Sequence, residues 1–107
     1  MTMTDCQIYA VDYDDALIVV VEGELDLTTA PVLDARLRAA ELVETRTVVV
    51  DLERVTFLDS SGLHVLIEHS RPERHGSRLR LTRGSRQVRR VFELVGMTQR
   101  LPFVSGA

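Results

Sequence analysis

The stretch TVVVDLERVTFLDSSGLHVLIEHS, residues 47–70, joins a strand pattern directly to a helix pattern. Residues 47–52 form a β-branched apolar run of the length of a strand. Beyond the DSSG tetrapeptide at residues 59–62, apolar side chains recur at helical spacing, at Leu63, Leu66 and Ile67. The pattern therefore predicts a strand that leads into a helix beginning close to Ser60.

Two adjacent hydroxyl groups, those of Ser60 and Ser61, lie where this helix is expected to begin. The N–H groups that open a helix lack partners within it, and the helix dipole places about half a positive charge at that end. A phosphoryl group there is tolerated locally. It would also add a charge of about −1.5 to −2 beside Asp59, so a partner docked on this surface would respond strongly.

Helix capping is the simpler role for the same residues. A short polar side chain, of Asp59 or Ser60, can accept a hydrogen bond from a helix-start N–H and contribute about 1 kcal/mol. The isolated tetrapeptide favours capping alone. The strand and helix patterns on either side of it give phosphorylation more weight.

Strand and helix patterns alternate along the rest of the chain. We predict strands at residues 7–11, 17–22, 47–52 and 78–82, with a turn at residues 12–15. We predict helices at residues 29–44, from Ser60, and from about Ser85, the last with Val88, Val91, Phe92 and Val95 inward and Gly96 as its stop. Pro72 should break or kink the Ser60 helix, and Gly76 should end the segment after it.

This alternation predicts an α/β fold. We expect a mixed, partly parallel sheet of about four to five strands, with helices packed mainly on one face. At 107 residues, the chain fits one domain, 1–107, without room for a large internal substrate cavity.

Composition indicates a cytoplasmic protein without membrane contact. No run approaches the ~20 apolar residues of a membrane span, and the first residues lack the pattern of a signal peptide. The single cysteine, Cys6, cannot form an internal disulfide and is expected at a strand edge.

Charge is divided unevenly along the chain. Residues 1–70 carry 4 Arg and 14 acidic residues, a net −10, whereas residues 71–107 carry 9 Arg and 2 acidic residues, a net +7. An arginine-rich C-terminal half is typical of nucleic-acid binding, which stays as an alternative function. However, the arginines alternate with apolar residues and no aromatic residue is interleaved with them, so we expect a solvated face or a patch for an acidic protein partner.

A catalytic site could consist of Asp59, Ser60 and His64, which are expected close together at the start of a helix. The chain lacks a Gly-x-Ser-x-Gly elbow, and Asp59 directly precedes the serine instead of orienting the histidine. The three histidines, His64, His69 and His75, are expected on the surface, without a cluster of metal ligands. The sequence thus predicts no catalytic residue, no cofactor and no metal site.

Four blocks of the sequence resemble the STAS domain of bacterial anti-sigma factor antagonists. They are GELD at residues 23–26, VVDL at 49–52, FLDSSGL at 57–63, and VFELVGM at 91–97 followed by Phe103 and Val104. The last block is similar to the last helix of that family, its glycine stop and its closing strand. The tetrapeptide alone is a weak motif, but four blocks in this order are specific, and the resemblance spans almost the whole chain.

The resemblance implies a bacterial phosphoprotein that regulates transcription by partner switching. In this family, the unmodified antagonist binds an anti-sigma factor that is also an ATP-binding serine kinase, and the sigma factor is released. The kinase phosphorylates the first serine of DSSG, here Ser60, which abolishes binding, and a serine phosphatase resets the antagonist. The protein would be a substrate and ligand, not an enzyme.

The resemblance also implies a partner-binding surface around Ser60. Its expected residues are Asp26, Thr28, Asp59, Ser61, Gly62 and Leu63. Local chemistry explains Asp26 equally well as a turn residue that caps the next helix, Gly62 as a site of close backbone approach, and Leu63 as a core residue.

A second function is compatible with the same fold. A STAS domain can be an unphosphorylated adaptor in a transporter or signalling complex, with Ser60 present only as a helix cap. The sequence also leaves open whether the chain forms a weak homodimer.

Overall fold

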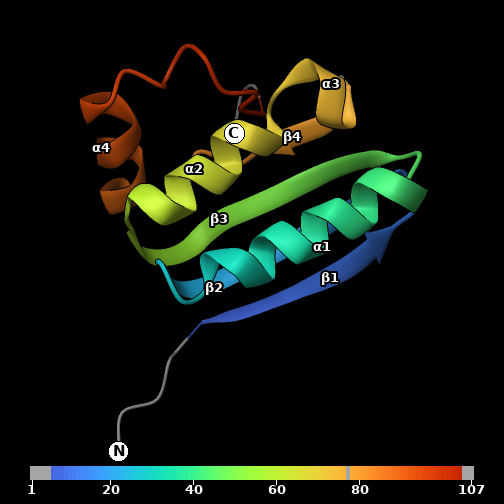
Figure 1. Ribbon diagram of the computed structural model, residues 1–107, viewed down its shortest axis with the longest axis horizontal. Helices are drawn as coiled ribbons and strands as arrows, with labels where there is room; N and C mark the ends of the chain where they lie inside the picture. Colours follow the sequence, from blue (N-terminus) through green and yellow to red (C-terminus); the bar gives the residue numbers. More distant parts are fainter. Residues whose placement is uncertain (1–5, 77, 105–107) are drawn as a thin grey trace, which may run out of the picture.

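A four-stranded mixed sheet is the centre of the computed structural model, which describes residues 6–76 and 78–104 (Figure 1). The strand order is β1-β2-β3-β4; β1 and β2 are antiparallel, and the other neighbours are parallel. The strands are β1 (Gln7–Tyr13), β2 (Ala16–Leu25), β3 (Thr47–Leu58) and β4 (Leu79–Leu81). This confirms the predicted α/β fold with a partly parallel sheet.

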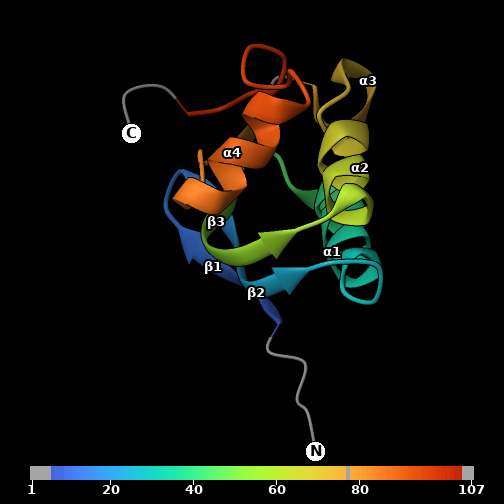
Figure 2. The ribbon, with the colours of Figure 1, turned by 90° about the vertical axis from the view of Figure 1, so that its left-hand side faces the viewer.

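The helices in the described residues are α1 (Ala30–Val43), α2 (Ser60–His69), α3 (Pro72–His75) and α4 (Arg86–Leu94). In Figure 2, α1 and α2 form a layer on one side of the sheet. Helix α4 contacts strand β3 and lies away from α1. The predicted arrangement of helices mainly on one face is therefore confirmed.

The core lies between this helix layer and the sheet. Val19 pairs in register with Val50, so their side chains point to the same face, and both are buried against Leu33 and Leu37 of α1. At the other end of the chain, Phe92 of α4 packs edge-on against Phe103, with ring centroids 5.1 Å apart.

Strand β3 continues to Leu58, six residues beyond the predicted end at residue 52. The charged pair Glu53 and Arg54 interrupts the apolar run, which hides the continuation in the sequence. Strand β3 continues because it stays paired with β2, through two register shifts, and Arg54 lies opposite Glu22. The predicted closing strand is reduced to one parallel bridge between Leu81 and Phe103.

The predicted break at Pro72 is confirmed. Helix α2 ends at His69, Arg71 is extended with ψ 138°, and α3 begins at Pro72. Gly76 ends this short helix with φ +65°, a conformation that favours glycine.

The expectation that all three histidines lie on the surface was wrong for two of them. His64 is exposed, but His69 and His75 are fully buried. The break at Pro72 folds α3 back so that both rings face α1, where Asp34 lies 2.7 Å from Nε2 of His69. The inward position expected for Val95 was also wrong, because α4 ends at Leu94 and Val95 is 44% exposed.

Candidate functional site

Two turns meet at the carboxyl-terminal edge of the parallel strands β2 and β3. Leu25 and Leu58 are paired in register, so the next residues, Asp26 and Asp59, leave the sheet side by side. The N–H of Asp59 also donates a hydrogen bond of 3.2 Å to the carbonyl oxygen of Leu25. Both turns lie at the same end of the molecule in Figure 1. Pairing of the two strands therefore brings the predicted Asp26 loop next to the start of α2.

Asp59 is the N-cap of α2. Its Oδ1 accepts hydrogen bonds from the N–H groups of Ser61 (2.8 Å) and Gly62 (3.2 Å). Ser60 is the first helical residue and is exposed. Because Asp59 already occupies two helix-start N–H groups, a phosphoryl group on Ser60 would not bind to them. The tolerance of a phosphoryl group expected from the sequence assumed free helix-start N–H groups, and Asp59 occupies two of them.

Gly62 allows the close approach that the sequence predicted. A Cβ atom at this position would lie 2.7 Å from Cγ of Leu25, 2.8 Å from its carbonyl oxygen and 2.8 Å from Cδ1 of Leu58. The start of α2 therefore contacts the strand ends directly. Leu63 is half-buried against the core, so its packing role is confirmed and a partner-contact role stays a prediction.

The loop between β2 and α1 is organised by Asp26. Its Oδ1 accepts hydrogen bonds from the N–H of Thr28 (3.0 Å), the hydroxyl of Thr28 (2.9 Å) and the N–H of Thr29 (3.2 Å). The Thr28 hydroxyl bond is the main cause that lowers the pKa of the Asp26 carboxyl below its ordinary value. Asp26 therefore has the turn role expected from local chemistry, but the expectation that it caps the next helix was wrong, because the N-cap of α1 is Thr29. The lowered pKa keeps Asp26 ionised near neutral pH.

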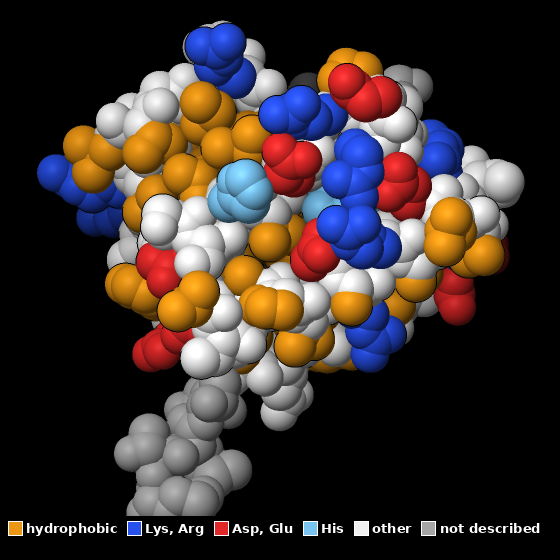
Figure 3. All heavy atoms as spheres, viewed as in Figure 1, with side chains coloured by type: hydrophobic (Ala, Val, Ile, Leu, Met, Phe, Trp, Pro, Cys, Tyr) orange, Lys and Arg blue, Asp and Glu red, His pale blue; other side chains and the backbone are white. Residues whose placement is uncertain are grey.

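A groove of about 340 Å³ runs between α1 and α2 from this edge. Its lining includes Leu27, Pro31, Asp34, Ser61, His64 and Val65. Figure 3 views the face covered by α1 and α2, and it shows hydrophobic side chains mainly on the left half and mixed charged side chains toward α3. The groove joins the Ser61 side of the candidate site to the surface of α1.

Leu27 is the main residue of this site that the sequence analysis missed. Its side chain is 73% exposed and contributes to the groove lining. An apolar residue between Asp26 and Thr28 in a polar loop was the signal available in the sequence. A single exposed leucine is ordinary in proteins. Leu27 becomes a candidate binding residue only because the structure places it in the groove beside α2.

The family model of the STAS domain matches residues 7–105. This chain belongs to the STAS domain family. The anti-sigma-B factor antagonist of Staphylococcus aureus (strain NCTC 8325 / PS 47) is 32% identical to it over 78 residues, which cover 72% of each chain. These findings confirm the family that the four sequence blocks resembled.

Solved structures agree with this STAS assignment. An anti-sigma factor antagonist from Mycobacterium paratuberculosis has a TM-score of 0.80 and 26% identity, covering 98% of this chain and 91% of that one. The Bacillus cell fate determinant SpoIIAA in its phosphorylated form has a TM-score of 0.65 and 23% identity, with coverage of 94% and 92%, and shares the fold. Within residues 6–76 and 78–104, no helix is long and apolar enough to cross a membrane.

Proposed function

We propose that this STAS domain is an anti-sigma factor antagonist that binds an ATP-binding anti-sigma factor serine kinase until Ser60 is phosphorylated. The observation that carries the proposal is the position of Ser60. It is the exposed first residue of α2, and Asp59, not Ser60, caps the helix. The Ser60 hydroxyl is therefore accessible to a kinase without disruption of the fold.

The effect of the phosphate on binding follows from its surroundings. Phosphorylation adds a charge of about −1.5 to −2 at pH 7. The new charge adjoins the Asp59 carboxylate, and the ionised Asp26 leaves the neighbouring strand at the same edge. An acidic or closely packed partner would then be repelled, and a serine phosphatase would restore binding.

The docking surface in this proposal includes the predicted residues Asp26, Thr28, Asp59, Ser61, Gly62 and Leu63, to which we add Leu27. Gly62 is buried and contributes by holding α2 close to the strand ends. Thr28 and Leu27 are exposed in the adjoining loop. A partner can thus contact the α2 start and the Asp26 loop together.

Capture of partners by two baits tests this function. Ser60→Ala and Ser60→Asp chains are immobilised, exposed to lysate of the native host, and the retained proteins are quantified by mass spectrometry. We expect the Ala bait to hold an anti-sigma serine kinase that the Asp bait loses. Thr45→Asp is the control, because Thr45 is exposed beyond the other end of α1.

Direct phosphorylation completes the test. The captured kinase, with ATP, should phosphorylate the wild-type chain at Ser60 and leave Ser60→Ala unmodified. Retention of the same transporter or scaffold proteins by both baits would contradict the switch and support the adaptor role.

The arginines of α4 offer a separate test of the nucleic-acid alternative. Arg86, Arg89 and Arg90 are exposed, whereas Val88 and Phe92 of the same helix are buried. This is the arrangement of a solvated helix face. We expect no binding to random DNA at low salt, and salt-sensitive binding would contradict that expectation.

A further inference from the structure

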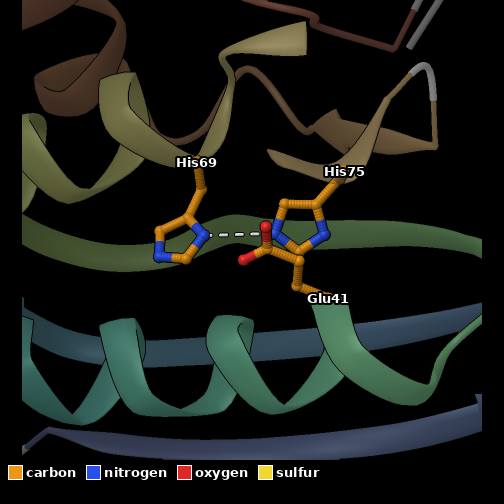
Figure 4. Close-up of side chains that lie close together, drawn as sticks. All are labelled: Glu41, His69 and His75. Carbon is orange, nitrogen blue, oxygen red and sulfur yellow. Dashed lines mark hydrogen bonds between the residues drawn. The ribbon is translucent and has the colours of Figure 1, made fainter. Parts of the chain in front are cut away.

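Two buried histidines lie in contact between α1 and the α2–α3 turn. Nδ1 of His69, the last residue of α2, is 3.1 Å from Nε2 of His75, the last residue of α3. Both side chains are 0% exposed. Figure 4 shows the Glu41 side chain reaching from α1 toward the two rings. This cluster lies apart from Ser60, and the proposed function does not use it.

We propose that Glu41, His69 and His75 form a zinc-binding site. Two imidazole nitrogens and a carboxylate oxygen are a typical zinc ligand set, completed by a water molecule. One ligand atom from each residue lies within 4.8 Å of the others. Nitrogens bound to tetrahedral zinc at about 2.0–2.1 Å are roughly 3.3 Å apart, close to the separation of the two rings.

Asp34 orients one of the two rings. It is paired with Arg38 through a 2.8 Å ion pair, and its Oδ1 is 2.7 Å from Nε2 of His69. A carboxylate accepts hydrogen bonds, so His69 carries its proton on Nε2 and presents the lone pair of Nδ1 toward His75. A carboxylate behind a histidine is the usual arrangement that fixes a metal ligand.

The protonation of the pair suits metal binding. Burial lowers the pKa of His75 to about 4 and also lowers the pKa of His69, so both rings are neutral near pH 7. Without metal, Nε2–H of His75 donates to His69, and the buried Nδ1 of His75 has no hydrogen-bond partner among the described residues. On zinc binding, the His75 proton moves from Nε2 to Nδ1, which leaves a lone pair on each ligand nitrogen.

Arg74 is the competing cation at this site. Its Nε and Nη2 donate to Glu41, but Oε2 of Glu41 accepts one of these bonds, at 3.0 Å, and retains a lone pair for a metal. Asp34 and Glu68 add negative charge nearby, and both line the α1–α2 groove together with Arg74. Displacement of the Arg74 side chain would open a path from the groove to the histidines.

Zinc binding to the intact protein tests the site. The metal-free chain is incubated with ZnCl2, freed of excess metal, and assayed for bound zinc by mass spectrometry and for affinity by chelator competition. We expect one zinc per chain. Asp34→Asn should weaken binding about 10- to 100-fold, and Glu41→Gln and His75→Gln at least as much.

His64→Gln is the matched control, because His64 is the exposed histidine of α2. It should bind zinc like the wild type. X-ray absorption of the zinc-loaded chain should show two histidine ligands at about 2.0–2.1 Å. Circular dichroism verifies that each metal-free variant is folded, and Glu41→Gln, at a half-buried position, keeps the test valid if His75→Gln unfolds.

Three results would overturn the proposal: no zinc retained by the wild type, equal affinity in folded Glu41→Gln, or loss of binding in His64→Gln. The last would indicate adventitious binding at the exposed face of α2. The site does not depend on Ser60, so its failure would leave the proposed function untouched.

Discussion

The N–H of Asp59 donates a 3.2 Å hydrogen bond to the carbonyl oxygen of Leu25. This bond continues the pairing of β2 and β3 by one step beyond Leu58. The bond holds Asp59, which precedes Ser60, against Leu25, which precedes Asp26. The candidate phosphorylation site and the Asp26 loop are therefore parts of one structural unit, so a partner can bind both together.

Asp59→Ala should lower the free energy of unfolding by about 1 kcal/mol, because it removes the cap from the N–H groups of Ser61 and Gly62. Urea denaturation measures the change. Asp59→Asn is the control, since its amide oxygen can accept the same bonds and should retain most of the stability. Equal stability of Asp59→Ala and the wild type would show that the cap contributes nothing.

Gly62→Ala should destabilise the fold by about 1–3 kcal/mol, because the new methyl group would overlap Leu25 and Leu58. Thermal and urea unfolding measure this loss. The control is Ser60→Ala, an exposed helical position where we expect a change within about 0.5 kcal/mol. A Gly62→Ala protein as stable as this control would contradict the close packing of α2.

Leu27→Ser should weaken binding to the proposed kinase partner about tenfold or more and leave stability unchanged, because the 73% exposed side chain contributes to the groove and not to the core. Calorimetry with the purified kinase measures the affinity. Leu42→Ser is the control, since Leu42 is 84% exposed near the other end of α1. Equal loss in both variants would indicate that the groove has no special part in binding.

Thr28→Val should raise the pKa of Asp26 toward its ordinary value, because the Thr28 hydroxyl bond is the main cause of the low pKa. A lowered pKa in the folded state means that the ionised carboxylate stabilises the fold above its unfolded pKa of about 4. That contribution is lost as pH falls through the lower, folded pKa. Carbon NMR titration of the Asp26 carboxyl measures the shift.

The control for this titration is Thr56→Val. Thr56 is exposed on β3, and its replacement should leave the Asp26 pKa unchanged. A Thr28→Val protein with the same Asp26 pKa as the wild type would assign the effect to the backbone N–H groups instead.

Helices α1, α2 and α4 were predictable because their signals are local, whereas the sequence predicted only a break at Pro72 where α3 begins. Thr29 and Pro31 mark the start of α1, and Gly96, with φ +74°, follows the end of α4. Capping, proline geometry and positive φ depend on adjacent residues, so they can be read along the chain. The inward Val88 and Phe92 follow helical spacing for the same reason.

The end of β3 was not predictable in this way. Glu53 and Arg54 interrupt the apolar run, and Arg54 stays in the strand because it lies opposite Glu22 on β2. Its Nη1 atom also forms a 3.2 Å ion pair with that glutamate. Both interactions join residues 32 positions apart, which no local pattern contains.

The sequence by itself determined the order of the four strands and of helices α1, α2 and α4, the break at Pro72, the family and the candidate serine. Periodicity, helix signals and motifs carry that information between close neighbours in the chain. Only the tertiary structure decided that Asp59 is the cap, that Leu27 lies in a groove and that His69 and His75 are buried beside Glu41. These features depend on contacts between distant segments, because sheet pairing and the packing of α3 against α1 set the distances between their side chains.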